Sequence, residues 1–433
     1  MRLRSLNLEL PKISVFIGME STLSHQEATL PCGLKIIFEP HVSRVVHCGF
    51  VVKAGTRNER TEESGMAHFL EHISFKGTHR RRACHITNGL ERVGGDLNAF
   101  TTKQETVYYA TVLREDYARA ADLLSDIVFH STYPQGEITK EIEVICDEIE
   151  SYRDSPSEII FDEFESLMYP NQPLGRDILG EAERLRTYVT ADAEAFARRF
   201  YRPENVIFFV YGDLDFRHIV RGMERLLPAS DFDHLSPRLD DAQPVAHPRL
   251  SGIERVVRKD THQAHVLIGA PTFGGSDPRR FALILINNML GGPGMNSRLN
   301  LSLRERAGLV YSVDSYLNTY PDTGFWNVYF GCDAKDVKRC RRLLMQELRK
   351  FIEKPLTPTQ LAAAKKQLCG QIGISSESAE NYALAMGKTF AHFGTHRDIA
   401  NLVEALQGVT AEEMQCVAAE VYDEDRLTTL IYQ

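Results

Sequence analysis

The chain has 433 residues, of which 43% are hydrophobic and 25% charged, and its formal net charge is −9. This composition is typical of a globular protein with room for two or three domains, and it excludes a largely disordered chain. A nucleic-acid-binding surface normally needs a basic stripe, and the basic cluster at 79–82 is short enough to be a solvated loop. We therefore expect no nucleic-acid partner.

The cysteines and the apolar segments both bear on the compartment in which we expect the protein. None of the eight cysteines forms a Cys-x-x-Cys pair, which argues against a cysteine-based zinc site and favours free thiols in a reducing compartment. No run of 18 apolar residues is present, so we expect no membrane-spanning helix and no membrane partner. Residues 1–18 carry charges that interrupt any secretory signal. We expect a cytoplasmic protein, with residues 1–18 either a loose extension or upstream of the natural start.

In chain order, the first half begins with strands over 33–39 and 45–54, separated by a turn at Pro40 and His41. A helix is expected over 64–75, with Gly77 just past its end, and a short helix over 84–93. Strands over 96–101 and 105–112 follow, then mainly helices to about residue 200. A buried strand over 205–211 completes this half.

The second half repeats the order of the first. Residues 228–247 hold several prolines and no clear periodicity, as expected of a linker. The elements predicted after it are a strand over 264–270, a helix over 277–290, strands over 310–317 and 324–331, helices through 334–422 and a last strand over 428–432. We expect a duplicated α+β unit, with one domain over 20–227 and a homologous one over 248–433.

The sequence His68-Phe69-Leu70-Glu71-His72 lies within the first predicted helix. Spacing of i and i+4 puts both imidazoles on one face, where both can reach one ion at about 2.0–2.1 Å. Glu71 can flank the metal and take a proton from a zinc-bound water. Two ordinary surface histidines are the alternative, but this pattern is rare by chance in a chain of this length. Apolar neighbours also bury the helix, so these polar groups need a partner such as a metal.

A third protein ligand is required for a catalytic zinc ion. The acidic helix over 141–150 can supply it, since Glu141 and Glu148 are two turns apart and share a face, whereas Asp147 and Glu150 lie off that face. Spacing alone does not choose among these four carboxylates, and any one of them could be solvated helix surface.

His68, Glu71 and His72, followed by Glu148 76 positions after His72, resemble the pitrilysin/insulinase family of inverted zinc peptidases. The resemblance extends over nearly the whole chain and is strongest to the short bacterial processing peptidases, which are similar to the β subunit of mitochondrial processing peptidase. It implies two α+β domains that face each other like a clamshell. It also implies one Zn²⁺ per chain, held by His68, His72 and Glu148, with Glu141 supporting the site from behind the ligands.

Two further segments resemble substrate-binding parts of that family. Residues 94–101 are similar to its edge strand, which implies that Asn98, Ala99 and Phe100 bind an extended peptide as an added strand. A protected internal strand is the alternative. Residues 291–299 are similar to its glycine-rich loop but include Pro293, which stiffens the loop and removes an N–H donor.

Arg304 and Tyr311 match the family's Arg/Tyr pair, which implies that they reach from the second domain to the substrate at the zinc. A surface charge and a core strand residue are the plainer interpretations. The second half holds no His-x-x-Glu-His sequence, so it is expected to bind no metal.

These patterns together predict a zinc metalloendopeptidase that hydrolyses peptides or unfolded segments, with Glu71 as general base. A non-catalytic structural or partner subunit is the first alternative, and the intact motif argues against it. A regulatory metal-binding module is the second, and it would leave Glu71 unexplained. Family members of this length commonly pair, so we expect a homodimer or pairing with a related chain.

Overall fold

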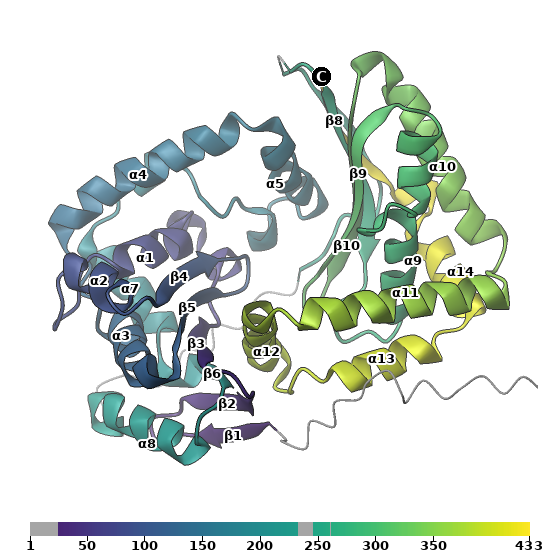
Figure 1. Cartoon of the computed structure of the whole chain (residues 1–433). Coiled ribbons are helices and arrows are strands. Elements are labelled where there is room, and N and C mark those ends of the chain that lie inside the picture. Colours follow the sequence, from purple (N-terminus) through teal and green to yellow (C-terminus); the bar gives the residue numbers. More distant parts are fainter. Residues whose placement is uncertain (1–24, 233–245, 260) are drawn as a thin grey trace, which may run out of the picture.

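The computed structural model of the chain describes residues 25–232, 246–259 and 261–433 (Figure 1). The predicted extension over 1–18 and most of the predicted linker over 228–247 lie outside these described residues. Within them, no helix combines the length and the apolar character needed to cross a membrane.

The first half of the chain builds a six-stranded sheet in the order β1-β2-β6-β3-β5-β4. Strands β2 and β6 run parallel, and the other neighbours are antiparallel. Among the described residues, β4 lies at one edge of this sheet and pairs only with β5. The bounds are β1 (Gln26–Thr29), β2 (Lys35–Pro40), β3 (Val45–Val52), β4 (Asp96–Thr101), β5 (Thr106–Leu113) and β6 (Val206–Gly212).

The second half builds a five-stranded sheet in the order β7-β11-β8-β10-β9. Strands β7 and β11 run parallel and the others antiparallel, so the sheet repeats the topology of the first one without β1. In this repeat β9 takes the edge position of β4. The bounds are β7 (Glu254–Val257), β8 (Ala264–Thr272), β9 (Val310–Thr319), β10 (Gly324–Cys332) and β11 (Thr428–Tyr432). The duplicated α+β unit that the sequence predicted is therefore confirmed.

Helices pack on both sheets. In the first half they are α1 (Met66–Ser74), α2 (Ala83–Glu91), α3 (Tyr117–His130), α4 (Gln135–Arg153), α5 (Pro156–Met168), α6 (Ala182–Leu185), α7 (Thr190–Phe200) and α8 (Phe216–Leu226). In the second half they are α9 (Arg280–Gly291), α10 (Val337–Glu353), α11 (Pro358–Ser376), α12 (Ala379–Phe393), α13 (Ile399–Gly408) and α14 (Ala411–Val421), with a π-helical segment at Asn300–Glu305.

The two halves exchange a helix with each other. Helix α12 of the second half packs against β3 and β6 of the first sheet, and α5 of the first half packs against β8 and β11 of the second (Figure 1). Strand β6 shows why this cover is needed, because all seven of its residues are buried although successive side chains point to opposite faces. Each sheet therefore has one face covered by helices of its own half and one face covered by a helix of the other half.

Polar contacts also join the two halves. Arg57 of the first half forms a bidentate pair with Asp322 of the second, with N···O distances of 2.8 and 2.5 Å. The hydroxyls of Tyr169 and Thr323 lie 3.1 Å apart across the same boundary. Because these contacts join residues more than 150 positions apart, the two halves depend on each other for their packing.

The sequence missed two strands and placed two helix starts too early, at 64 for α1 and at 277 for α9, which begins at Arg280. Strands β1 and β7 are short and largely exposed, so they lack the alternation of apolar side chains that identifies a strand. Helix α1 begins at Met66 instead of residue 64, because Gly65 adopts a left-handed conformation with φ of 78°. A Cβ at Gly65 would also approach the Leu179 carbonyl oxygen to 2.7 Å, which only glycine avoids.

Candidate metal centre

Helix α1 is held by its apolar side and by a buried carboxylate at its start. Ala67, Phe69, Leu70 and Ile73 are fully buried in the core of the first half. Glu59 accepts hydrogen bonds from the backbone N–H groups of Gly65 and Ala67, at 3.0 and 2.8 Å, and so satisfies two donors at the helix start. The remaining side of the helix carries His68, Glu71 and His72 toward α4 and β4.

His68, His72 and Glu148 come together between α1 and α4. Nε2 of His68 lies 3.9 Å from Oε2 of Glu148, and Nε2 of His72 lies 3.7 Å from the same oxygen. One ligand atom from each residue fits within a span of 4.8 Å. Two ligands of a tetrahedral zinc ion at about 2.1 Å are separated by about 3.4 Å, so only a small adjustment is needed to hold one. Among the described residues, this is the group able to hold a metal.

Helix α4 presents Glu141 and Glu148 on the same side, two turns apart. Glu141 lies 3.0 Å from Nδ1 of His72 and 2.6 Å from Nζ of Lys76. Asp147, Glu148 and Glu150 are all exposed, but Asp147 and Glu150 form no hydrogen bond or ion pair with either histidine. The structure thus places Glu148 beside the imidazoles and Glu141 behind His72, a choice that sequence spacing had left open.

The electrostatics of the cluster favour a cation. Burial, together with the neighbouring His72, lowers the pKa of His68 to about 3. Its imidazole is therefore neutral and can offer a nitrogen lone pair to a metal. Burial acts to lower the pKa of His72, but the hydrogen bond with Glu141 and the nearby carboxylates outweigh burial and raise it. Burial likewise opposes the charge on Glu141, yet His72 and Lys76 lower its pKa. Two imidazoles and a carboxylate are a donor set that suits zinc, with Glu141 orienting one ring.

Glu71 lies beside the cluster but outside the ligand set. Its carboxylate is buried, and Oε2 accepts a hydrogen bond of 2.6 Å from the hydroxyl of Thr101. Burial raises the pKa of Glu71, and the bond from Thr101 opposes part of that rise. A base with a raised pKa beside a metal site suits proton transfer near neutral pH. Thr101 ends the predicted edge strand, but no spacing rule had connected it with Glu71.

Strand β4 occupies the edge position expected of a peptide-binding strand. Ala99 lies on the side packed against the first core, whereas Phe100 lies on the side covered by α12. Asn98 is exposed. The alternative of an internal strand is therefore wrong for β4, whose other side has no partner strand within the described residues.

Arg304 and Tyr311 lie together in the second half. The guanidinium carbon of Arg304, in the π-helical segment, is 5.9 Å from the ring centre of Tyr311 on the edge strand β9. Tyr311 is 81% exposed, so it is not the core residue of the plainer interpretation. No hydrogen bond or ion pair in the described part of the chain joins either residue to the metal cluster. Their predicted action at the zinc stays a prediction.

The glycine-rich loop follows α9 directly. A Cβ at Gly291 would approach Cβ of Ser315 in β9 to 2.6 Å, so this glycine permits close packing of the helix end on the edge strand. Pro293 is exposed in the loop. The loop thus sits beside the strand that carries Tyr311.

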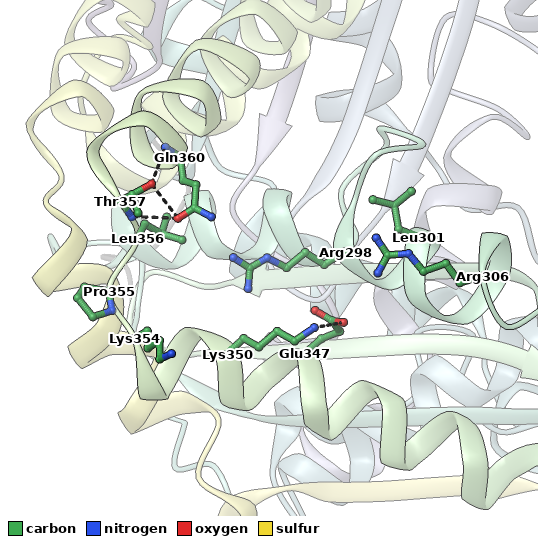
Figure 2. Close-up of a pocket in the computed structure, with 10 residues that line it drawn as sticks. All are labelled: Arg298, Leu301, Arg306, Glu347, Lys350, Lys354, Pro355, Leu356, Thr357 and Gln360. Atoms are coloured by element: carbon green, nitrogen blue, oxygen red, sulfur yellow. Dashed lines mark hydrogen bonds and ion pairs between the residues drawn. The ribbon is translucent and has the colours of Figure 1, made fainter.

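A cavity of about 510 Å³ lies apart from the metal cluster, in the second half (Figure 2). It is largely basic, and its single acidic lining residue, Glu347, pairs with Lys350 at 2.7 Å. The lining residues are Arg298, Leu301, Arg306, Glu347, Lys350, Lys354, Pro355, Leu356, Thr357 and Gln360. Since no residue of the cluster lines it, the cavity and the metal centre are separate features.

Comparison with known proteins decides the family. Residues 35–182 match insulinase (peptidase family M16), and residues 189–368 match the peptidase M16 inactive domain. An uncharacterized zinc protease of Bacillus subtilis is 32% identical over 401 residues, which covers 92% of this chain and 96% of that relative. The chain belongs to peptidase family M16. Its metal cluster lies wholly within the first of these two matched regions.

Other similar proteins agree in sequence and in fold. An uncharacterized zinc protease of Mycobacterium tuberculosis is 31% identical over 407 residues, which covers 92% of this M16 chain and 91% of the relative. A protease from Helicobacter pylori superposes with a TM-score of 0.87 at 21% identity, over 95% of this chain and 99% of that one. A structure of a peptidase M16 inactive domain from Pseudomonas fluorescens gives 0.85 at 19% identity, over 95% and 98%. The predicted family and fold class are confirmed.

Proposed function

We propose that this M16 protein is a zinc metalloendopeptidase that hydrolyses peptides or unfolded polypeptide segments. The observation that carries the proposal is the meeting of His68, His72 and Glu148 beside the buried carboxylate of Glu71. Relatives named zinc proteases support zinc as the metal. We propose one ion per chain, which the single cluster among the described residues supports.

Each residue around the cluster would have its own role in hydrolysis. Zinc, when bound, would polarise the scissile carbonyl and lower the pKa of a coordinated water. Glu71 would accept the proton of the attacking water and pass it to the leaving amine. Thr101 donates to Oε2 of Glu71, and we propose that Oε1 carries that proton. Glu141 would hold the ring of His72 in place.

The substrate would lie along the open edge of β4. An extended peptide can pair with the unpartnered backbone of Asn98, Ala99 and Phe100, which positions it beside α1. We further propose that Arg304 holds the peptide backbone and that Tyr311 donates to the carbonyl oxygen as negative charge develops on it. Their exposure and mutual contact support this role, which requires the two domains to close on the substrate like a clamshell.

Assembly is part of the same proposal. The two sheets use residues from 26–212 and from 254–432, which supports domains over 20–227 and 248–433 with the linker between them. We propose that two such chains, or this chain and a related one, pair to enclose the substrate. A peptide of unfolded character is the expected substrate class, because an edge strand binds only an extended backbone.

The rival function is a non-catalytic partner subunit of a peptidase-like complex. Such a chain has no need for a buried base beside a metal cluster, and the presence of Glu71 with its bond from Thr101 argues against it. Zinc content and digestion of a peptide mixture, read by mass spectrometry, separate the two. We expect cleavage that a chelator abolishes and added zinc restores. A zinc-loaded chain that leaves every peptide intact would exclude the enzyme and support the subunit.

A further inference from the structure

The hydroxyl of Thr101 donates its hydrogen bond to Glu71. It lies 2.6 Å from Oε2 of Glu71 and 3.4 Å from the hydroxyl of Thr106. The Thr106 hydroxyl already donates to the carbonyl oxygen of Ala54 at 3.0 Å. Thr101 therefore donates to the carboxylate, and this bond fixes which way the carboxylate of Glu71 faces.

Thr101 is in turn held by the tight turn that joins β4 and β5. The backbone N–H of Thr102 donates to the carbonyl of Glu105 at 2.8 Å, and the hydroxyl of Thr102 accepts from the N–H groups of Gln104 and Glu105. Lys103, Gln104 and Glu105 are all buried. A buried turn with these bonds leaves Thr101 little freedom to move away from Glu71.

The second half of the chain supplies two side chains that hold this turn. Glu105 is 4% exposed, and its carboxylate lies 2.6 Å from Nε2 of His392 and 3.4 Å from Nζ of Lys388, both on α12. On its other side, Lys103 lies 3.7 Å from both Asp162 and Glu165 of α5. The turn is thus clamped between the two exchanged helices.

We infer that Thr101 is a positioning residue for Glu71, and that α12 holds Thr101 in place through the contact of His392 with Glu105. The inference rests on the proposed function, because it assigns Glu71 as the base. It gives the second half a part in proton transfer that is independent of Arg304 and Tyr311. The path runs from His392 through Glu105 and the turn to Thr101 and then to Glu71.

The first test compares Thr101→Val with Thr101→Ser in the full chain. Valine keeps the shape of threonine but removes the donor, so we expect kcat to fall about 10- to 100-fold, with KM and zinc content unchanged. Serine keeps the donor and should restore kcat to within about threefold of the wild type. A Thr101→Val protein with normal kcat, or with lost zinc, would overturn the positioning role, and so would failure of serine to restore kcat.

The second test asks whether His392 acts through Thr101. His392→Phe keeps a ring and removes the donor to Glu105, and should lower kcat about threefold or more by loosening the turn. In the Thr101→Val background the same change should have no further effect, since coupled residues do not act additively. Equal losses in both backgrounds would overturn the path. His396→Phe is the matched control, because His396 lies 2.6 Å from Glu39 on β2 and does not touch the turn.

Measuring the peptidase activity of the wild type separates this inference from the proposed function on which it rests. A zinc-loaded wild type without peptidase activity contradicts the proposed function itself. An active wild type with an equally active Thr101→Val variant contradicts only the positioning role of Thr101.

Discussion

The imidazole of His72 and the carboxylate of Glu141 share a hydrogen bond of 3.0 Å between Nδ1 and Oε1. With Nδ1 engaged in this way, Nε2 is the nitrogen that faces Glu148, at 3.7 Å. Lys76 binds the other oxygen of Glu141 and helps to hold the carboxylate beside the ring of His72. One helix thus supplies both a direct ligand candidate and the group that orients another ligand.

Glu148→Gln and Glu141→Gln should therefore weaken zinc binding to different extents. Glu141→Gln removes the carboxylate behind His72 and is expected to lower zinc affinity about 10–100-fold. Glu148→Gln removes a direct ligand and should lower zinc affinity further. Zinc titration against a competing chelator measures both, with Glu143→Gln, exposed on the same helix, as the control. A larger loss from Glu141 than from Glu148 would reverse their assignments.

Glu71→Gln should abolish turnover and leave zinc in place. Glutamine keeps the size of glutamate and can still accept the bond from Thr101, but it cannot take up a proton. We expect kcat to fall by about 10²–10⁴, the usual contribution of a general base. Zinc content by elemental analysis and peptide cleavage are measured on the same preparation. Loss of the metal, or cleavage at the wild-type rate, would rule out Glu71 as the base.

Tyr311→Phe should slow hydrolysis by about 10²–10³ without releasing zinc, as expected when one donor to a developing oxyanion is lost. Arg304→Ala should act mainly on KM, because Arg304 is proposed to hold the substrate backbone. Tyr316→Phe on the same strand is the matched control and should leave kcat unchanged.

The full chain is needed for the Tyr311 and Arg304 measurements, because α12 covers the first sheet and the first half alone would expose that apolar face. Full activity in both variants would leave the second half with no direct part at the zinc.

Glu105 should make the stability of the chain depend on pH. Burial opposes its charge, but the hydrogen bond with His392 and the charge of Lys388 outweigh burial and lower its pKa below 4.5. A carboxylate with a lowered folded-state pKa contributes stability that is complete above the unfolded-state value and is lost as pH falls through the folded-state value. Glu105→Gln should lower Tm at pH 7 and have a smaller effect below pH 4.5. An effect that grows on acidification would contradict this sign.

Asp322→Asn should destabilise the boundary between the halves. The side chain of Arg57 is 2% exposed, and Asp322→Asn removes the negative charge from its bidentate partner. Because Asp322 is partly exposed, we expect a loss at the low end of the usual range, about 3 kcal/mol. Thermal unfolding measures it, with Asp213→Asn in the exposed pair with Arg114 as the control. Equal Tm values for Asp322→Asn and the wild type would show that the pair does not hold the halves together.

The sequence by itself determined the order of the elements, the duplication and the metal motif. These features are local, since helical and strand periodicity and the i, i+4 spacing of His68 and His72 depend only on neighbours along the chain. Strand β4 was located to the residue for this reason, whereas β1 and β7 were missed because exposed edge strands carry no apolar alternation.

Only the tertiary structure decided which partners these elements meet. Local patterns show that a side chain is buried but not what buries it, so the exchange of α5 and α12 between the sheets was invisible in the sequence. The same limit applies to the site. Glu148, and not Asp147 or Glu150, meets the histidines because of how α4 lies on α1, and Thr101 reaches Glu71 because β4 passes beside α1. Such contacts depend on the packing of whole elements against one another, which no spacing along the chain records.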